Sequence, residues 1–155
     1  MRTLRICFLF MFLPSLAIAQ ASELAQQQES LTRDCKNVRG HAGRVVEETS
    51  QPELNTDLAR AHAGEVVKNL HAMEQRLQSV RKLYTKEQLV RVGANQTSME
   101  KTCDTLKDLA GRLEQELKKE NPDRLQARKI AMELRAEMNK GYDVHQKMKK
   151  SLGMK

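Results

Sequence analysis

A helical repeat of apolar side chains occupies residues 89–117, which read LVRVGANQTSMEKTCDTLKDLAGRLEQEL. The repeating positions alternate in steps of three and four, and they are Leu89, Val92, Gln96, Met99, Cys103, Leu106, Ala110, Leu113 and Leu117. Such steps keep all these side chains on one face of an α-helix, as in the seam of a helical bundle or coiled coil. The stretch therefore predicts a long amphipathic helix.

The same three-four pattern predicts three further helices in the rest of the chain. We expect helices over residues 22–48, 52–84, 86–119 and 122–150. Four amphipathic helices joined by short turns are typical of an all-α, antiparallel up-down-up-down four-helix bundle. At this length, residues 20–155 are expected to form a single domain.

Helix starts are predicted from capping signals. Residues 50–53 (SQPE) and 85–88 (TKEQ) each have the spacing of a capping box. Residues 121–123 (NPD) combine a capping side chain, a proline suited to the first turn and a carboxylate that favours the helix dipole. These signals predict N-caps at Ser50, Thr85 and Asn121.

The first residues have the features of a signal peptide. Arg2 and Arg5 precede an apolar run over residues 6–19, which ends in the small-x-small pattern that a signal peptidase recognises. This run is too short to span a bilayer comfortably. We therefore expect residues 1–19 to be removed after Ala19, leaving a soluble periplasmic or secreted protein.

The charge of the chain indicates solubility rather than a specific polyanionic partner. The formal net charge is +7, which becomes about +5 when the two signal-peptide arginines are removed. Such a charge gives weak attraction to anionic surfaces and no specific nucleic-acid recognition. The expected contact with an anionic envelope surface is the basic end of the last helix, at Lys147, Lys149 and Lys150. Helix periodicity is equally compatible with a monomer and with a homodimer. The sequence does not identify a protein partner.

Two cysteines, Cys35 and Cys103, follow the predicted signal peptide. An even pair of cysteines in an exported chain favours a disulfide, because oxidising compartments promote pairing. The bond would join two diagonal helices of the bundle, which requires their Cα atoms to approach within about 7 Å. The alternatives are two reduced cysteines packed as small hydrophobic residues, or a Cys–His–Cys metal site in which His71, expected level with Cys35, joins the two reduced thiols.

An internal repeat places two histidines in equivalent positions. Residues 39–46 (RGHAGRVV) match residues 60–67 (RAHAGEVV) at a spacing of 21, which is three heptads. The copies lie almost symmetrically about the turn near residue 51, so His41 and His62 are expected at similar heights in a helical hairpin. They are candidate ligands of one metal ion or members of a pH-sensitive pair. Close backbone packing through the small residues of the repeat is the alternative interpretation.

A haem-binding alternative involves His145. Residues 142–147, YDVHQK, are similar to the C-terminal segment of the soluble periplasmic b-type cytochrome, which is itself a four-helix bundle. The resemblance implies that His145 is an axial haem ligand. The other axial ligand of that family is a methionine near the start of the first helix, where this chain has three glutamines at residues 26–28. A buried histidine near one end of the bundle is the alternative.

Catalytic motifs are absent from the sequence. It contains no glycine-rich phosphate loop, no HExxH motif and no CxxC motif. We therefore expect an exported, non-enzymatic helical bundle without a cofactor, which acts as a structural or protein-interaction module. The alternative function is a periplasmic metal- or haem-binding four-helix bundle that uses His41 and His62, or His145.

Overall fold

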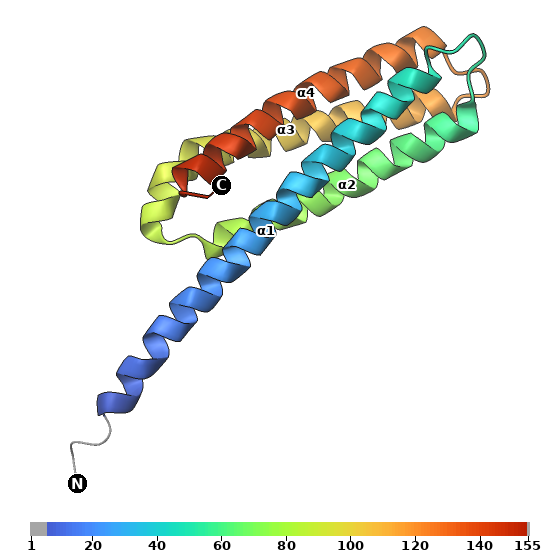
Figure 1. Cartoon of the computed structure of the whole chain (residues 1–155). Helices are drawn as coiled ribbons and strands as arrows, with labels where there is room; N and C mark the ends of the chain where they lie inside the picture. Colours follow the sequence, from blue (N-terminus) through green and yellow to red (C-terminus); the bar gives the residue numbers. More distant parts are fainter. Residues whose placement is uncertain (1–5, 155) are drawn as a thin grey trace.

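The computed structural model describes residues 6–154, with side chains from Ile18 onward, and contains four long helices (Figure 1). They are α1 (Ile6–Glu48), α2 (Thr56–Leu83), α3 (Lys86–Lys118) and α4 (Arg124–Ser151). No strand occurs within this described range. The all-α bundle that the apolar periodicity predicts is therefore confirmed.

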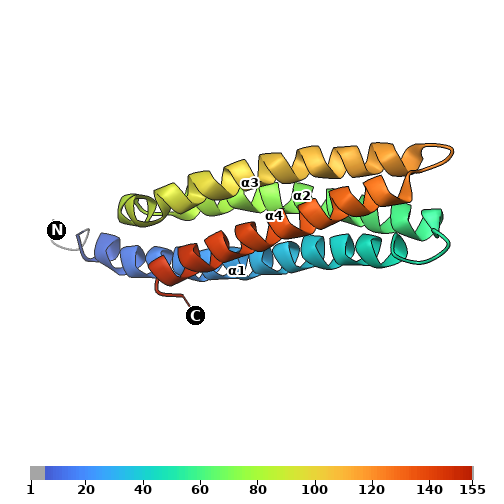
Figure 2. The ribbon, with the colours of Figure 1, turned by 90° about the horizontal axis from the view of Figure 1, so that it is seen from above.

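Each helix lies beside two others, because α1 and α3 both pack against α2 and against α4 (Figure 2). The α1–α2 turn and the α3–α4 turn lie at the same end of the bundle (Figure 1). There the Arg124 guanidinium donates to the backbone carbonyls of Gln51 and Pro52. A short turn at Tyr84 and Thr85 joins α2 to α3 at the other end. Helices that are consecutive in sequence are therefore neighbours in space.

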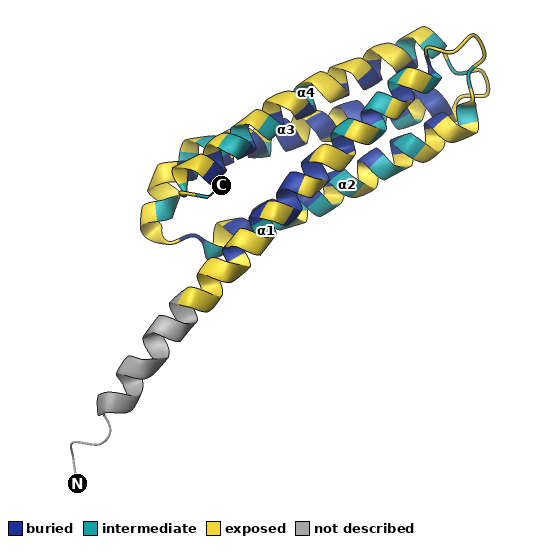
Figure 3. Ribbon diagram, in the orientation of Figure 1, coloured by how far each residue is buried: buried dark blue, intermediate teal, exposed yellow. Residues whose placement is uncertain are grey.

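The buried faces of the helices meet in the interior, and the outer faces are exposed (Figure 3). In α3, the predicted seam is buried from Val92 to Leu117. Leu89, the first residue of that seam, is 37% exposed because it lies in the first turn at the end of the bundle. The largest fully buried aliphatic side chains are Leu31, Met73, Met99, Leu106, Leu113, Leu117, Leu134, Met138 and Met148. Burying each contributes about 1.5–3 kcal/mol, so this interior dominates the stabilisation of the bundle.

The predicted start of α2 is wrong. Ser50 does not cap α2, because its hydroxyl donates to the Val46 carbonyl (2.5 Å) in the last turn of α1. The helix begins at Thr56, and the side chain of Asn55 caps it by accepting from the Leu58 N–H at 3.1 Å. The α1–α2 turn is therefore longer than the capping spacing predicts.

The predicted start of α3 is confirmed, whereas that of α4 is wrong. The Thr85 hydroxyl accepts from the Gln88 N–H at 3.2 Å, and the Gln88 side chain accepts from the Thr85 N–H at 2.9 Å. The N-cap of α4 is Asp123 rather than Asn121. The buried Glu116 carboxylate accepts from the Asp123 N–H at 2.9 Å, which holds that residue in position to cap α4.

The signal-peptide prediction concerns a part of the chain that is only partly described. Residues 1–5 and the side chains of residues 6–17 lie outside the described part, and α1 begins at Ile6. Removal of residues 1–19 therefore stays a prediction. Among the described residues, no helix combines the length and hydrophobicity needed to cross a bilayer.

Candidate functional site

A surface groove runs between α2 and α3. Three neighbouring cavities lie along it, with volumes of about 90, 210 and 270 Å³. Glu114 borders the first two and Glu74 borders the last two, so the cavities follow one another as a row of hollows. On α2 the lining extends from Arg60 to Arg81, which corresponds to roughly 30 Å of helix. We call this row of hollows the α2–α3 groove.

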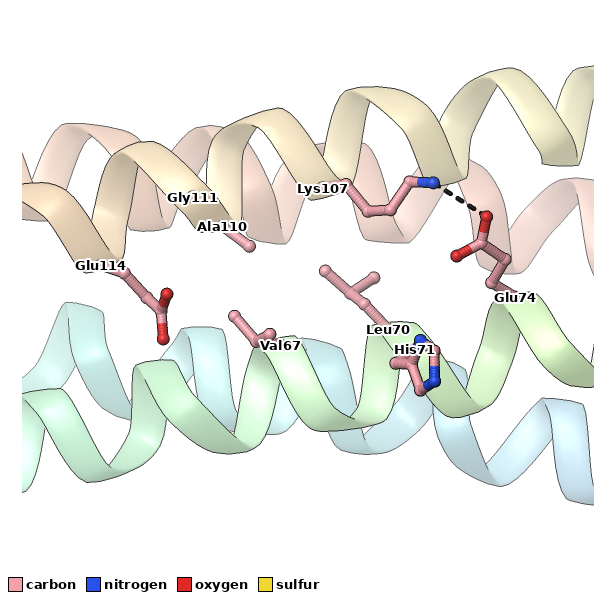
Figure 4. A pocket seen from close by; sticks show the side chains of 8 residues that line it. All are labelled: Val67, Leu70, His71, Glu74, Lys107, Ala110, Gly111 and Glu114. Carbon is pink, nitrogen blue, oxygen red and sulfur yellow. Dashed lines mark hydrogen bonds and ion pairs between the residues drawn. The ribbon is translucent and has the colours of Figure 1, made fainter.

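The floor of the α2–α3 groove is apolar at its middle. Val67 and Leu70 of α2 lie opposite Ala110 and Gly111 of α3 (Figure 4). Val67 is 37% exposed although it is a large apolar residue. At Gly111, no atom lies within 4 Å of the position that a Cβ would occupy, so the floor is open there. The groove therefore offers accessible apolar surface between two helices.

Ion pairs cross the groove and link its walls. The Lys107 ammonium lies 2.8 Å from the Glu74 carboxylate (Figure 4), and the Arg81 guanidinium lies 3.2 Å from the Glu100 carboxylate. The bond to Glu74 raises the pKa of Lys107. Because these pairs are partly exposed, each contributes at most about 1 kcal/mol to stability. They leave the walls with paired charges of both signs.

The apolar periodicity of the sequence does not predict this groove. The three-four pattern assigns Leu70 and Ala110 to the interior, but it does not predict how the side chains next to these positions are arranged. Val67 and Gly111 each directly follow a buried seam residue and flank the apolar interior. An apolar or very small residue in that flanking position, repeated on two neighbouring helices, is the signal that marks such a groove.

The two histidines of the internal repeat lie side by side between α1 and α2. His41 Nδ1 is 3.2 Å from His62 Nδ1, and their ring centroids are 5.4 Å apart with the ring planes tilted by 39°. Both side chains are half-buried. The structure therefore brings together the two residues that the repeat singles out, and it directs the same ring atom of each toward the other.

Close backbone packing does not explain the glycines of the repeat. Nothing lies within 4 Å of the position that a Cβ would occupy at Gly40 or at Gly64. At Gly43 the nearest atom is the Arg135 Nε, at an ordinary contact distance of 3.9 Å. The packing interpretation is therefore wrong for the glycines, because Gly40 and Gly64 border open space and Gly43 contacts a side chain rather than a neighbouring backbone.

The predicted disulfide between Cys35 and Cys103 is absent, and both residues are buried free thiols. No Cα atom of α1 lies within 8 Å of one in α3, whereas a disulfide requires about 7 Å or less. The Cys35 thiol instead donates to the Met73 sulfur of α2 at 3.6 Å. Burial raises the pKa of each thiol to about 12. The cysteines behave as small core residues because they lie on diagonal helices.

The structure does not bring His71 to Cys35. His71 is exposed on α2, where its Nε2 lies 2.8 Å from the Gln75 amide nitrogen, and it borders the α2–α3 groove. Within the described part of the chain, no group of three or more His, Cys, Asp or Glu side chains is arranged to hold a metal ion. A metal site in this part therefore has at most two such protein ligands.

His145 is fully buried and bonded to α1. Its Nε2 lies 2.9 Å from the Thr32 hydroxyl and 3.3 Å from the Gln28 carbonyl, while its Nδ1 has no hydrogen-bond partner. Burial lowers the pKa of the imidazole to about 4. Ligation of haem iron through Nε2 requires that atom to leave its contact with Thr32. The assignment of His145 as an axial ligand stays a prediction.

The basic end of α4 is only partly available to an outside partner. Lys147 and Lys150 are exposed, but Lys149 is buried and bonded to the Glu29 carboxylate. That bond lowers the pKa of Glu29. The predicted contact with an anionic surface therefore depends on Lys147 and Lys150.

Comparisons with protein-family models, with curated proteins and with solved structures each find no match to this chain.

Proposed function

We propose that this chain is an exported, non-enzymatic protein-interaction module built as an antiparallel up-down-up-down four-helix bundle. The signal-like residues 1–19 support export. The contact of Arg124 with the α1–α2 turn supports the topology, because it ties together the two turns expected at one end. The sequence carries no catalytic motif, which favours a role that depends on surface contacts.

The α2–α3 groove is the observation that carries this proposal. We propose that its occupant is an amphipathic helix of a partner protein. The cavities follow roughly 30 Å of α2, which is the length of about 20 residues of helix at 1.5 Å per residue. Apolar residues spaced three and four apart on the partner would cover Val67 and Leu70, and its polar flanks would meet the charged walls.

The shape of the groove favours a helix over a small molecule. Drug-sized and cofactor pockets have volumes of about 300–1,000 Å³ and enclose most of their ligand. The cavities of the groove are each smaller, at about 90, 210 and 270 Å³, and they follow one another along the surface. An extended apolar stripe fills such a series of hollows better than one compact ligand.

A site-specific cross-linking experiment tests the proposal. A photoreactive amino acid is placed at Val67 in the groove and, as a control, at Met132, which is 53% exposed on α4. Irradiation in the native host should join Val67 to a segment with apolar residues at helical spacing. Mass spectrometry identifies that segment, and a synthetic peptide of it is then used for binding measurements.

Two glycine substitutions on α3 form a matched pair for the binding measurement. Gly111→Gln places an amide in the floor of the groove, whereas Gly93→Gln places the same side chain outside the residues that line it. Neither glycine has an atom within 4 Å of its Cβ position, so both variants should fold. We expect Gly111→Gln to weaken peptide binding at least tenfold and Gly93→Gln to leave it unchanged. Equal binding by the two variants, or equal capture at Val67 and Met132, would contradict the proposal.

A further inference from the structure

We propose that His41 and His62 form a Zn²⁺ site that cross-links α1 to α2. Imidazole nitrogens are good ligands for zinc, and the two Nδ1 atoms face each other from neighbouring helices. The site lies at the internal repeat and shares no residue with the α2–α3 groove. It is therefore independent of the docking proposal.

The spacing of the two nitrogens fits a tetrahedral ion. With zinc–nitrogen bonds of about 2.05 Å, a separation of 3.2 Å gives a nitrogen–metal–nitrogen angle of about 103°, which is near tetrahedral. The right angle of a square-planar ion would require a separation of about 2.9 Å at the same bond length. The separation of the two nitrogens is thus compatible with a tetrahedral Zn²⁺ ion bound by both.

Binding requires a rearrangement of protons within the pair and a rotation of the two rings, because the ion lies to one side of the line that joins the Nδ1 atoms. When two neutral rings share the Nδ1–Nδ1 hydrogen bond, the donor ring carries its proton on Nδ1 and none on Nε2. The other ring accepts through the lone pair of its Nδ1. Zinc needs both Nδ1 lone pairs, so the donor ring moves its proton to Nε2. Each imidazole stays neutral, and the ion replaces the proton that the two rings share.

The remaining coordination positions are open to solvent. No third His, Cys, Asp or Glu joins the pair in the described part of the chain, so two water molecules complete a four-coordinate ion. The space around Gly40 and Gly64 is unobstructed, and both histidines are half-exposed. The half-exposed side chains of the two histidines therefore leave the remaining coordination positions accessible to solvent.

Calorimetric titration of the untagged full-length chain with ZnCl₂ tests this site. We expect one ion per chain, and at least tenfold weaker binding in His41→Gln and in His62→Gln. His71→Gln is the matched control, because His71 is an exposed histidine on the same helix as His62. Its affinity for zinc should equal that of the unmodified chain.

Thermal unfolding provides a second readout that does not depend on heat of binding. An ion held only by the folded state stabilises it, so Zn²⁺ should raise the unfolding midpoint of the unmodified chain and of His71→Gln. Neither His41→Gln nor His62→Gln should respond, although both should melt cooperatively without zinc. Absence of saturable binding, or binding that survives either substitution, would overturn the proposal.

Discussion

At the scale of single residues, the interior near His145 is short of hydrogen-bond donors. The Thr32 hydroxyl donates to the Gln28 carbonyl at 3.0 Å, so His145 carries its proton on Nε2, facing both groups. Its Nδ1 is then an acceptor without a partner, and within the described part of the chain the Gln28 side-chain oxygen is likewise buried without a donor. The neutral imidazole donates from Nε2 to the Thr32 hydroxyl and the Gln28 carbonyl of α1, whereas its Nδ1 has no donor. A charged imidazole would be costly because it is fully buried.

This burial predicts that His145 makes the fold sensitive to mild acid. Its pKa is about 4 in the folded state, where burial and the Lys149 charge outweigh the opposing effects of the Gln28 bond and Glu29, and about 6.5 when unfolded. Unfolding therefore takes up a proton between these pH values. The contribution of the neutral imidazole is complete above pH 6.5 and is lost as the pH falls to 4, up to about 3 kcal/mol.

Urea unfolding at pH 7 and pH 4.5 measures this loss against a substitution. His145→Leu should be less stable than the unmodified chain at pH 7, because the bond to Thr32 is removed. It should also lose less stability on acidification. His71→Gln serves as control and should keep the full pH dependence. An identical loss in His145→Leu and the unmodified chain would show that another group controls the acid response.

At the scale of the helix, apolar periodicity is more informative than capping spacing. The seam of α3 is predicted because a period of 3.6 residues determines which side chains can meet the interior. The start of a helix depends instead on which of several neighbouring side chains forms the capping hydrogen bond to the free backbone N–H groups of the first turn. Ser50 terminates α1 rather than starting α2, and Asp123 displaces Asn121 as the cap of α4. The spacing of these residues in the sequence does not show which side chain forms the cap.

Two glycine-to-alanine substitutions should have opposite effects on helix stability. Gly64→Ala adds a methyl group in open space on α2 and removes a weak helix former, so it should stabilise the fold by up to about 1 kcal/mol. Gly141→Ala on α4 places its Cβ 2.9 Å from the Thr102 methyl group and 3.0 Å from the Met138 methyl group. It should destabilise by about 1–3 kcal/mol because these buried neighbours must move. Denaturant unfolding without zinc measures both, and a stabilised Gly141→Ala would contradict the tight contact.

At the scale of the whole molecule, the sequence predicts heights along the bundle better than lateral positions. His41 and His62 come together because they lie on consecutive helices, about equally far from the turn that joins them. Cys35 and Cys103 also have comparable predicted heights, but they lie on α1 and α3, which do not pack against each other. The α2–α3 groove likewise depends on how side chains of two helices meet. Such lateral arrangements arise from packing and not from periodicity.

The arrangement of α1 and α3 leads to a prediction about cooperative unfolding. Because both thiols are buried and burial raises their pKa to about 12, few thiolates exist at pH 8, and alkylation should be suppressed by roughly 10³-fold or more. In a Cys7→Ser background, iodoacetamide should label neither Cys35 nor Cys103 in the native chain, and both after unfolding. Since the thiols sit on different helices, their labelling rates should rise together with denaturant if the bundle opens as one unit. Early labelling of one cysteine would indicate that its helix opens separately, and labelling that requires a reductant would show that the two cysteines pair after all.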